Sequence, residues 1–405
     1  MTNVEKFILE NWGNTIRTCE KDDGTLIALP KPFTIPTMRD HFQEMYYWDT
    51  YFTNVGLFLS DLGEQAKNNT ENVAYMIDKY GFMPNGNRTY FLNRSQPPYF
   101  TLMVRDVYEQ TKDKQWLEKM YFTGCKEHDF WENNRKTTCG LNRYHGITLK
   151  EDYKTKASQF SRRIQEECPE SEEECKKLAE ISVSFCESGW DLNSRYGMRP
   201  HEHAGIDLNS LLYGMEENLA FFADELGFEH NWRQIAEERK ALINKLCWNE
   251  KRGIFCDYDF VNEKVCDFFS WAAFYPLFTG LATKEQAEST IKQLHLLEYD
   301  YGVACCENRE DLLDFQWDYP FGWAPEHYVI MNSLKRYGHE NDAKRVAKKY
   351  CDLVERNFET TKNLWEKYNV TTGTVTKDRE HSQFDNVPTM MGWSAGIYLY
   401  ALTQK

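Results

Sequence analysis

The most regular pattern along the chain is a spacing of hydrophobic positions by three and four residues. Between residues 207 and 227 the apolar side chains fall on one face of an α-helix. We expect Asp207 to cap the start of this helix, because a carboxylate can accept from the free backbone N–H groups there. Gly227 is expected to end the helix, because glycine readily adopts left-handed backbone angles. The same spacing predicts a helix over residues 343–358.

Weaker forms of this pattern predict further helices, about a dozen in all. Strand-like segments are few, and the best are residues 253–260 and 369–375. The further helices are expected near residues 3–12, 45–62, 64–80, 98–112, 114–135, 172–187, 229–247, 270–282, 284–295, 325–337 and 389–402.

Helices of this length that follow one another in pairs are typical of antiparallel hairpins. Because no Pro- or Ser-rich linker interrupts the series, we predict one all-α domain over residues 1–405, an (α/α)6 toroid. A helical-repeat solenoid is the alternative, but no fixed repeat period is visible. In either case the long segments between the helices are expected to carry the function.

The composition narrows the class of protein. Of the 405 residues 61 are aromatic, which excludes a disordered chain. The net charge is −15, from 48 Lys and Arg against 63 Asp and Glu, so a nucleic-acid partner is not expected. The acidic run at residues 166–177 is interpreted as the exposed start of a helix.

The cysteines and the N-terminus bear on the compartment. No segment approaches the roughly 18 apolar residues that span a membrane, and the first residues do not resemble a secretion signal. The 12 cysteines include no C-x-x-C pair, which is typical of free thiols in a reducing compartment. These features predict a cytoplasmic protein without a membrane, metal or cofactor partner.

Five segments between the helices combine Trp or Tyr with acids and amides. Aromatic faces stack on the C–H surfaces of sugars, and carboxylates and amides bind sugar hydroxyls. For any one Trp–Asp pair a buried ring beside a helix cap is the simpler interpretation, but the five segments together predict a binding site for a small carbohydrate. They are residues 41–52, 81–100, 187–196, 315–328 and 365–373.

These segments resemble the inverting α,α-trehalases. Residues 42–51 follow that family's F-x-E-x-Y-x-W-D-x-Y pattern, and residues 316–325 (QWDYPFGWAP) match its second motif in full. The resemblance extends over residues 39–397 and implies an (α/α)6 barrel that hydrolyses an α-glucosidic bond. Weaker matches occur at residues 81–88, 95–100, 188–196, 207–209 and 366–370.

The resemblance assigns the catalytic pair. It implies Asp191 as the general acid and Glu366 as the general base. Inverting glycosidases need such a pair about 6.5–9.5 Å apart, so that a water fits between base and sugar. We expect burial beside Trp190 to keep Asp191 protonated. From the residues alone, a helix cap for Asp191 and a surface salt bridge for Glu366 remain alternatives.

The resemblance also implies a set of sugar-binding residues, with three departures from the family. His41 replaces a motif arginine, no R-P-E-S motif precedes Asp191, and residues 378–385 replace a glycine-rich lid. The substrate is therefore expected to be trehalose or a related α-glucoside such as glucosylglycerate. The expected binding residues are Phe42, Tyr47, Trp48, Asp49, Asn85, Arg94, Gln96, Trp190, Arg195, Gln316, Trp317, Asp318, Trp323 and Glu380.

Two other functions compete with this hypothesis. A sugar 2-epimerase on the same toroid would use a histidine base, because the pKa of histidine lies near neutrality. His201, His203, His327 and His381 are the candidates. A sugar-binding protein without catalysis would keep the aromatic residues, but the retained pair of carboxylates argues against it.

Overall fold

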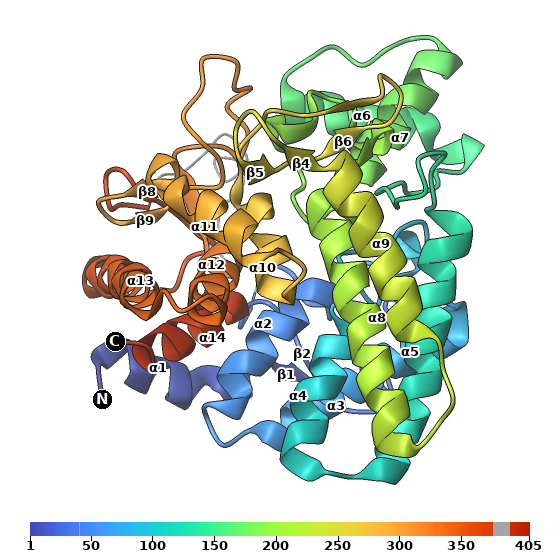
Figure 1. The fold of residues 1–405 in the computed structure, drawn as a ribbon. Coiled ribbons are helices and arrows are strands. Elements are labelled where there is room, and N and C mark those ends of the chain that lie inside the picture. The colour runs from blue at the N-terminus through green and yellow to red at the C-terminus, as the bar shows by residue number, and fades with distance from the viewer. Residues whose placement is uncertain (40, 376–388) are drawn as a thin grey trace.

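The computed structural model describes residues 1–39, 41–375 and 389–405, and this part of the chain is mainly α-helical (Figure 1). Fourteen α-helices are found in it. They are α1 (Asn3–Asn11), α2 (Tyr47–Phe58), α3 (Gly63–Tyr80), α4 (Phe100–Thr111), α5 (Lys114–Asn134), α6 (Tyr153–Ile164), α7 (Glu172–Glu187), α8 (Ile206–Leu226), α9 (Trp232–Leu246), α10 (Tyr275–Thr279), α11 (Lys284–Lys292), α12 (Ala324–Arg336), α13 (Glu340–Thr361) and α14 (Gly392–Leu402).

Six of these helices form a closed ring. Contacts run from α2 to α4, α8, α10, α12 and α14, and α14 packs back against α2. Two glycines permit this closure, because a Cβ on Gly56 would lie 2.4 Å from the Cα of Gly396. Helices α3, α5, α9 and α13 pack on the outside of the ring. The predicted (α/α)6 toroid is therefore confirmed.

For α8, the helix with the clearest sequence pattern, the predicted end is correct but the predicted N-cap is wrong. It spans Ile206–Leu226 and ends at Gly227, whose φ of 74° confirms the predicted stop. Its N-cap is Gly205, however, and not Asp207. The Asp207 carboxylate instead accepts from the buried guanidinium of Arg195 at 2.7 Å. A tertiary ion pair thus replaces the expected cap.

Short antiparallel strands occur in the segments between the helices. The strand expected at residues 253–260 is divided in two, and the one expected at 369–375 lies earlier in the chain. The described strands are β1 (Ile16–Arg17), β2 (Phe33–Thr34), β3 (His203–Ala204), β4 (Trp248–Asn249), β5 (Ile254–Phe255), β6 (Tyr258–Asp259), β7 (Lys264–Val265), β8 (Glu298–Tyr299), β9 (Gly302–Val303), β10 (Phe321–Trp323) and β11 (Lys367–Asn369).

Helices α6 and α7 form a separate hairpin, which lies beyond the long helices α5, α8 and α9 in Figure 1. They pack on a small second core that includes Phe160, Phe185 and Tyr196. Sequence analysis did not predict α6. The acidic run does supply the exposed first turn of α7, with Ser171 as its N-cap, as expected.

The described helices contain no stretch that is long and apolar enough to cross a membrane. One large cluster of buried hydrophobic side chains runs through the ring. It includes seven tryptophans that are at most 2% exposed, and most of these lie toward the end of the ring where α2, α12 and α14 begin. They are Trp12, Trp48, Trp131, Trp190, Trp271, Trp317 and Trp323.

Candidate active site

A cavity of about 170 Å³ lies where α2, α12 and α14 begin. It brings together both predicted catalytic residues, Asp191 and Glu366, although they lie far apart in the chain. The predicted residues that line the cavity are Phe42, Trp48, Asp49, Asn85, Arg94, Gln96, Asp191, Gln316, Trp317, Trp323 and Glu366.

Asp191 lies in the turn that follows α7. Gly189 makes this turn possible, because its φ is 75° and a Cβ there would meet the Trp48 ring at 2.9 Å. The Asp191 side chain is 39% exposed, and its Oδ2 lies 3.1 Å from Nη2 of Arg163 on α6. The expected enclosure of Asp191 by apolar groups is therefore wrong. The carboxylate faces the cavity and has a cationic partner that sequence analysis missed.

Glu366 immediately precedes β11, and the pairing of β11 with β10 fixes its position. Trp323 lies opposite Lys367 in this antiparallel ladder. The indole Nε1 of Trp393 donates to the backbone oxygen of Glu366 at 3.2 Å. The second trehalase-like motif and Glu366 thus reach one wall of the cavity through backbone pairing that their sequence positions do not reveal.

Asp49 is a third carboxyl group in the cavity, in the first turn of α2. Burial raises the pKa of Asp49 to about 8, and the nearby charges of Glu366 and Asp191 act in the same direction. At neutral pH its carboxyl group is therefore protonated, so it can donate a hydrogen bond to a sugar hydroxyl as well as accept one.

This protonation state predicts that substrate binding weakens in alkaline solution. Above about pH 8, ionised Asp49 loses its donor and adds a charge beside two carboxylates, so KM for a sugar substrate is expected to rise about tenfold by about pH 9.5. Steady-state kinetics across this range measure the effect. The Asp49→Asn variant keeps a donor at every pH and should show a flat KM. A wild-type KM that stays constant would contradict the prediction.

Stacked tryptophans form the aromatic wall. The Trp317 and Trp323 rings are nearly parallel, with centroids 3.8 Å apart, and Trp48 lies 5.6 Å from Trp317. Trp393 packs edge-on against Trp323 at 5.6 Å. All four rings line the cavity. Such rigid, flat surfaces suit the apolar face of a pyranose ring.

The amide residues of the cavity are fixed by bonds to their neighbours. Oε1 of Gln96 accepts from the backbone N–H of Trp48 at 3.2 Å, which directs its NH₂ group elsewhere as a donor. Oε1 of Gln316 accepts from Nζ of Lys367 at 3.3 Å. Arg94 packs over Phe91 at 4.9 Å. These contacts orient the polar groups before a ligand binds.

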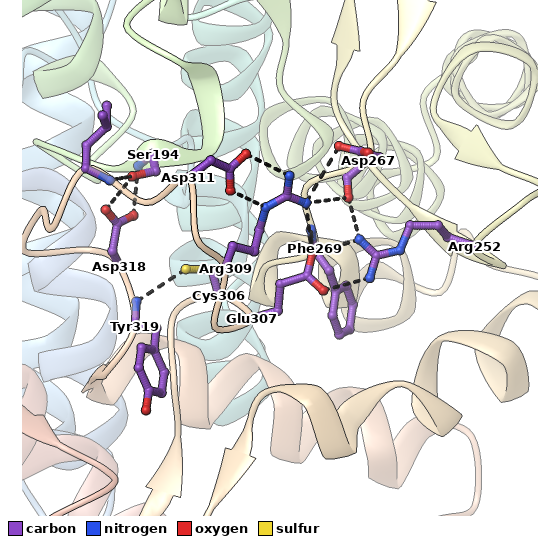
Figure 2. Close-up of polar contacts among 11 residues, drawn as sticks. Ser194, Arg252, Asp267, Phe269, Cys306, Glu307, Arg309, Asp311, Asp318 and Tyr319 are labelled. Atoms are coloured by element: carbon purple, nitrogen blue, oxygen red, sulfur yellow. Dashed lines mark hydrogen bonds and ion pairs between the residues drawn. The ribbon is translucent and has the colours of Figure 1, made fainter.

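The loop that carries the second motif is braced by ion pairs. Arg252 binds Glu307 through two nitrogens, each at 2.7 Å, and Arg309 lies 3.2 Å from Glu307 and 2.7 Å from Asp311 (Figure 2). Single exposed ion pairs stabilise a protein little, but a shared network with a bidentate pair holds a loop more firmly.

Asp318 anchors the same loop from inside. Its Oδ1 accepts from the backbone N–H of Ser194 at 2.8 Å (Figure 2). Its Oδ2 accepts from the backbone N–H of Phe315 at 3.0 Å. Burial raises the pKa of Asp318 to about 6, although these hydrogen bonds oppose the rise. The residue therefore ties the second motif to the segment after Asp191.

Four predicted binding residues lie behind the lining of the cavity, where they hold other residues. Tyr47 bonds to buried Glu127, and Trp190 stacks on Trp271 at 4.6 Å. Arg195 is enclosed between Asp207 and Asp257. Asp318 is the fourth, and all four are at most 4% exposed: Tyr47, Trp190, Arg195 and Asp318.

Glu187 joins three segments behind the cavity. Its carboxylate binds the Arg135 guanidinium at 2.8 Å and accepts from the backbone N–H groups of Ser95 and His145 at 2.8 and 2.6 Å. Although burial opposes the shift, Arg135 lowers the pKa of Glu187. The buried pair thereby fixes the loop that carries Arg94.

Sequence analysis missed several residues that line or contact the cavity. The predicted Glu380, like His381, lies outside the described residues. Tyr46, Phe91 and Gly189 belong to segments that the sequence had already indicated as sugar-binding. Nothing in the sequence pattern indicated the others. The missed residues are Pro36, Tyr46, Phe91, Arg163, Cys186, Gly189, Met391 and Trp393.

Three of the four histidine candidates for an epimerase base lie in the described part of the chain, and none of these three lines the cavity. His327 is fully buried, its Nε2 accepts from the Val303 N–H at 3.0 Å, and burial lowers its pKa to about 4. His201 and His203 are also absent from the lining. No group of three metal-ligating side chains suited to an ion occurs in the described part of the chain.

The toroid with its acidic, tryptophan-lined cavity defines a glycoside hydrolase. A family model described as Trehalase matches residues 8–405. The chain therefore belongs to the trehalase family.

Individual relatives agree with this assignment. A periplasmic trehalase of Escherichia coli is 31% identical, over 96% of this chain and 72% of that protein. A putative periplasmic trehalase of Salmonella typhi is 32% identical, over 95% and 70%. The structure of neutral trehalase from Saccharomyces cerevisiae has a TM-score of 0.76 and 27% identity, over 92% of this chain and 73% of that one. A mannosylglycerate hydrolase from Thermus thermophilus, at 15% identity and a TM-score of 0.67, shares the fold.

The comparisons correct the predicted location and favour the leading functional hypothesis over its alternatives. The curated relatives are named periplasmic, so the expected cytoplasmic location is wrong and the relatives point to the periplasm. All 12 cysteines are free in the structure, as expected. Free thiols are therefore not a reliable indicator of the compartment for this protein. The family assignment also disfavours the epimerase and the non-catalytic binding protein.

Proposed function

We propose that this protein hydrolyses α,α-trehalose or a closely related α-glucoside with inversion, using Asp191 as the general acid and Glu366 as the general base. The observation that carries the proposal is the convergence of these two carboxylates on one cavity beneath the tryptophan wall. Both occupy the positions that match the motifs of the family. We further propose that residues 1–405 act as one catalytic domain, without nucleic acid or a cofactor.

The reaction proceeds by a single displacement. Asp191 donates its proton to the glycosidic oxygen, so that the bond from this oxygen to C1 breaks and the second sugar leaves as a neutral alcohol. Glu366 accepts a proton from water, and the water oxygen attacks C1 from the opposite face. Protonated Asp49 and Gln96 bind the hydroxyls of the glucose that is attacked. The proton lost by Asp191 returns from Glu366 through solvent.

The stereochemistry of the products tests the proposal. Inverting hydrolysis of α,α-trehalose releases one β-glucose from the attacked centre and one α-glucose from the leaving group. Proton NMR in the first minutes, before mutarotation, is expected to show equal amounts of the two anomers. A double-displacement mechanism would release α-glucose alone, and an inert protein would release neither.

A further inference from the structure

We propose that the leaving-group side of this cavity binds an anionic group, a carboxylate or a phosphate on the aglycone, through Lys156 and Arg163 of α6. The inference rests on the proposed function and names its substrate class. It concerns the region where the R-P-E-S motif of the family has no match in this chain.

The position of α6 identifies the side of the cavity. Arg163 contacts Asp191 at 3.1 Å. Because the general acid lies beside the glycosidic oxygen, a cation next to it faces the departing group. Lys156 precedes Arg163 by seven residues, which is two helical turns, so both side chains lie on the same face of α6.

Lys156 is the less expected of the two cations. It is half-buried, and burial together with the charge of Arg94 lowers its pKa. In the described residues no carboxylate forms an ion pair with Lys156. A half-buried ammonium group beside a buried guanidinium raises the energy of the empty site, and an anion would relieve that cost.

Arg94 extends the cationic group into the cavity. It is 8% exposed, and within the described chain its Nε has no hydrogen-bond partner. Cys186 lines the same cavity, and Arg94, Arg163 and Lys156 all act on its thiol electrostatically. Of the three cations, Arg94 lines the cavity, Arg163 contacts Asp191 from α6, and Lys156 lies on the same face of α6, in a protein whose net charge is −15.

An anionic aglycone would also compete for the partner of the general acid. In the free protein Nη2 of Arg163 lies 3.1 Å from Oδ2 of Asp191. An anion on the aglycone would draw Arg163 toward the leaving group. The hydroxyls of a second glucose are weaker partners for a guanidinium than a phosphate or carboxylate is.

The test compares matched neutral and anionic substrates. Trehalose 6-phosphate is compared with trehalose, and glucosylglycerate with glucosylglycerol, so that the phosphate and carboxylate arms are read separately. We expect kcat/KM for the anionic member of at least one pair to be about tenfold higher or more. Equal or lower values for both anionic members would overturn the inference, while turnover of trehalose would still support the proposed function.

Variants connect the preference to α6. Lys156→Gln is expected to remove most of the preference for the anion and to change kcat/KM for trehalose by less than about twofold. Arg163→Gln should also remove it, whereas Arg162→Gln, an exposed neighbour on the same helix, should retain it. A preference that survives both Lys156→Gln and Arg163→Gln would place the anion elsewhere.

Binding can be read without turnover. Calorimetric titration of the Glu366→Gln variant with glucose 6-phosphate and with glucose measures recognition of the phosphate directly. Glucose 6-phosphate is expected to bind about tenfold more tightly than glucose. The double variant with both Glu366→Gln and Lys156→Gln should bind the two ligands equally. No gain from the phosphate, together with no preference in turnover, would refute the proposed site.

Discussion

Replacement of Asp191 by Asn is expected to lower kcat for trehalose by about 10³-fold, the contribution typical of a general acid. Asn has the same shape, so the fold and the contact with Arg163 are largely kept, but it has no proton to give to the leaving oxygen. Glucose release in a coupled assay measures kcat. α-Glucosyl fluoride is the informative second substrate, because fluoride departs without protonation, and the variant should hydrolyse it at close to the wild-type rate.

The control for this variant is Asp300→Asn, which makes the same chemical change at an exposed carboxylate outside the cavity. It should leave kcat unchanged with both substrates. If Asp191→Asn hydrolysed trehalose at nearly the wild-type rate, Asp191 would have no role as the acid. If instead the variant lost activity toward both substrates equally, Asp191 would act in binding or in the base-catalysed step.

Replacement of Glu366 by Gln is expected to reduce kcat by about 10³-fold for trehalose and for α-glucosyl fluoride alike. Both reactions need a water that has been activated by a carboxylate, and an amide does not accept the proton. The KM for trehalose should change much less, because the hydroxyls of the sugar are bound by other residues. The same coupled assay, together with fluoride release, measures both rates.

Glu250→Gln is the matched control, since Glu250 is exposed and does not line the cavity. Circular dichroism and thermal unfolding establish that the catalytic variants are folded. Full turnover of either substrate by Glu366→Gln would remove this residue from the mechanism. With α-glucosyl fluoride, Asp191→Asn should remain active and Glu366→Gln should not. This difference distinguishes the acid from the base, whereas both variants lose trehalose hydrolysis.

One departure from the family, the missing R-P-E-S motif, concerns the proposed leaving-group side of the active site. The residues proposed to bind the attacked glucose match the family motifs, and they line the cavity. On the leaving-group side, Arg163 is supplied by α6, which rests on its own small core. A hairpin with a separate core can change its surface residues without disturbing the ring, because few of its contacts are shared with the ring helices.

Helix α6 could not be predicted from its own sequence. Its sequence is rich in charge, and its apolar face becomes visible only once Phe160 is seen to pack on Phe185 of α7 at 6.1 Å. For Asp207 the local sequence predicted a helix cap that the structure does not contain. Its type and position suit a helix cap, but the buried Arg195 nearby is a stronger partner for a carboxylate than backbone N–H groups are.

The sequence by itself determined the helical periodicity, the stop at Gly227 and the motif positions of Asp191 and Glu366, because these depend on local spacing and residue type. Only the tertiary structure decided which groups meet. It brought Trp393 and Arg163 to the cavity, paired β10 with β11, and placed Asp49 near two other carboxylates so that its pKa rises to about 8. Electrostatic and packing energies depend on distance in space, and distant parts of a chain acquire that proximity only when the ring closes.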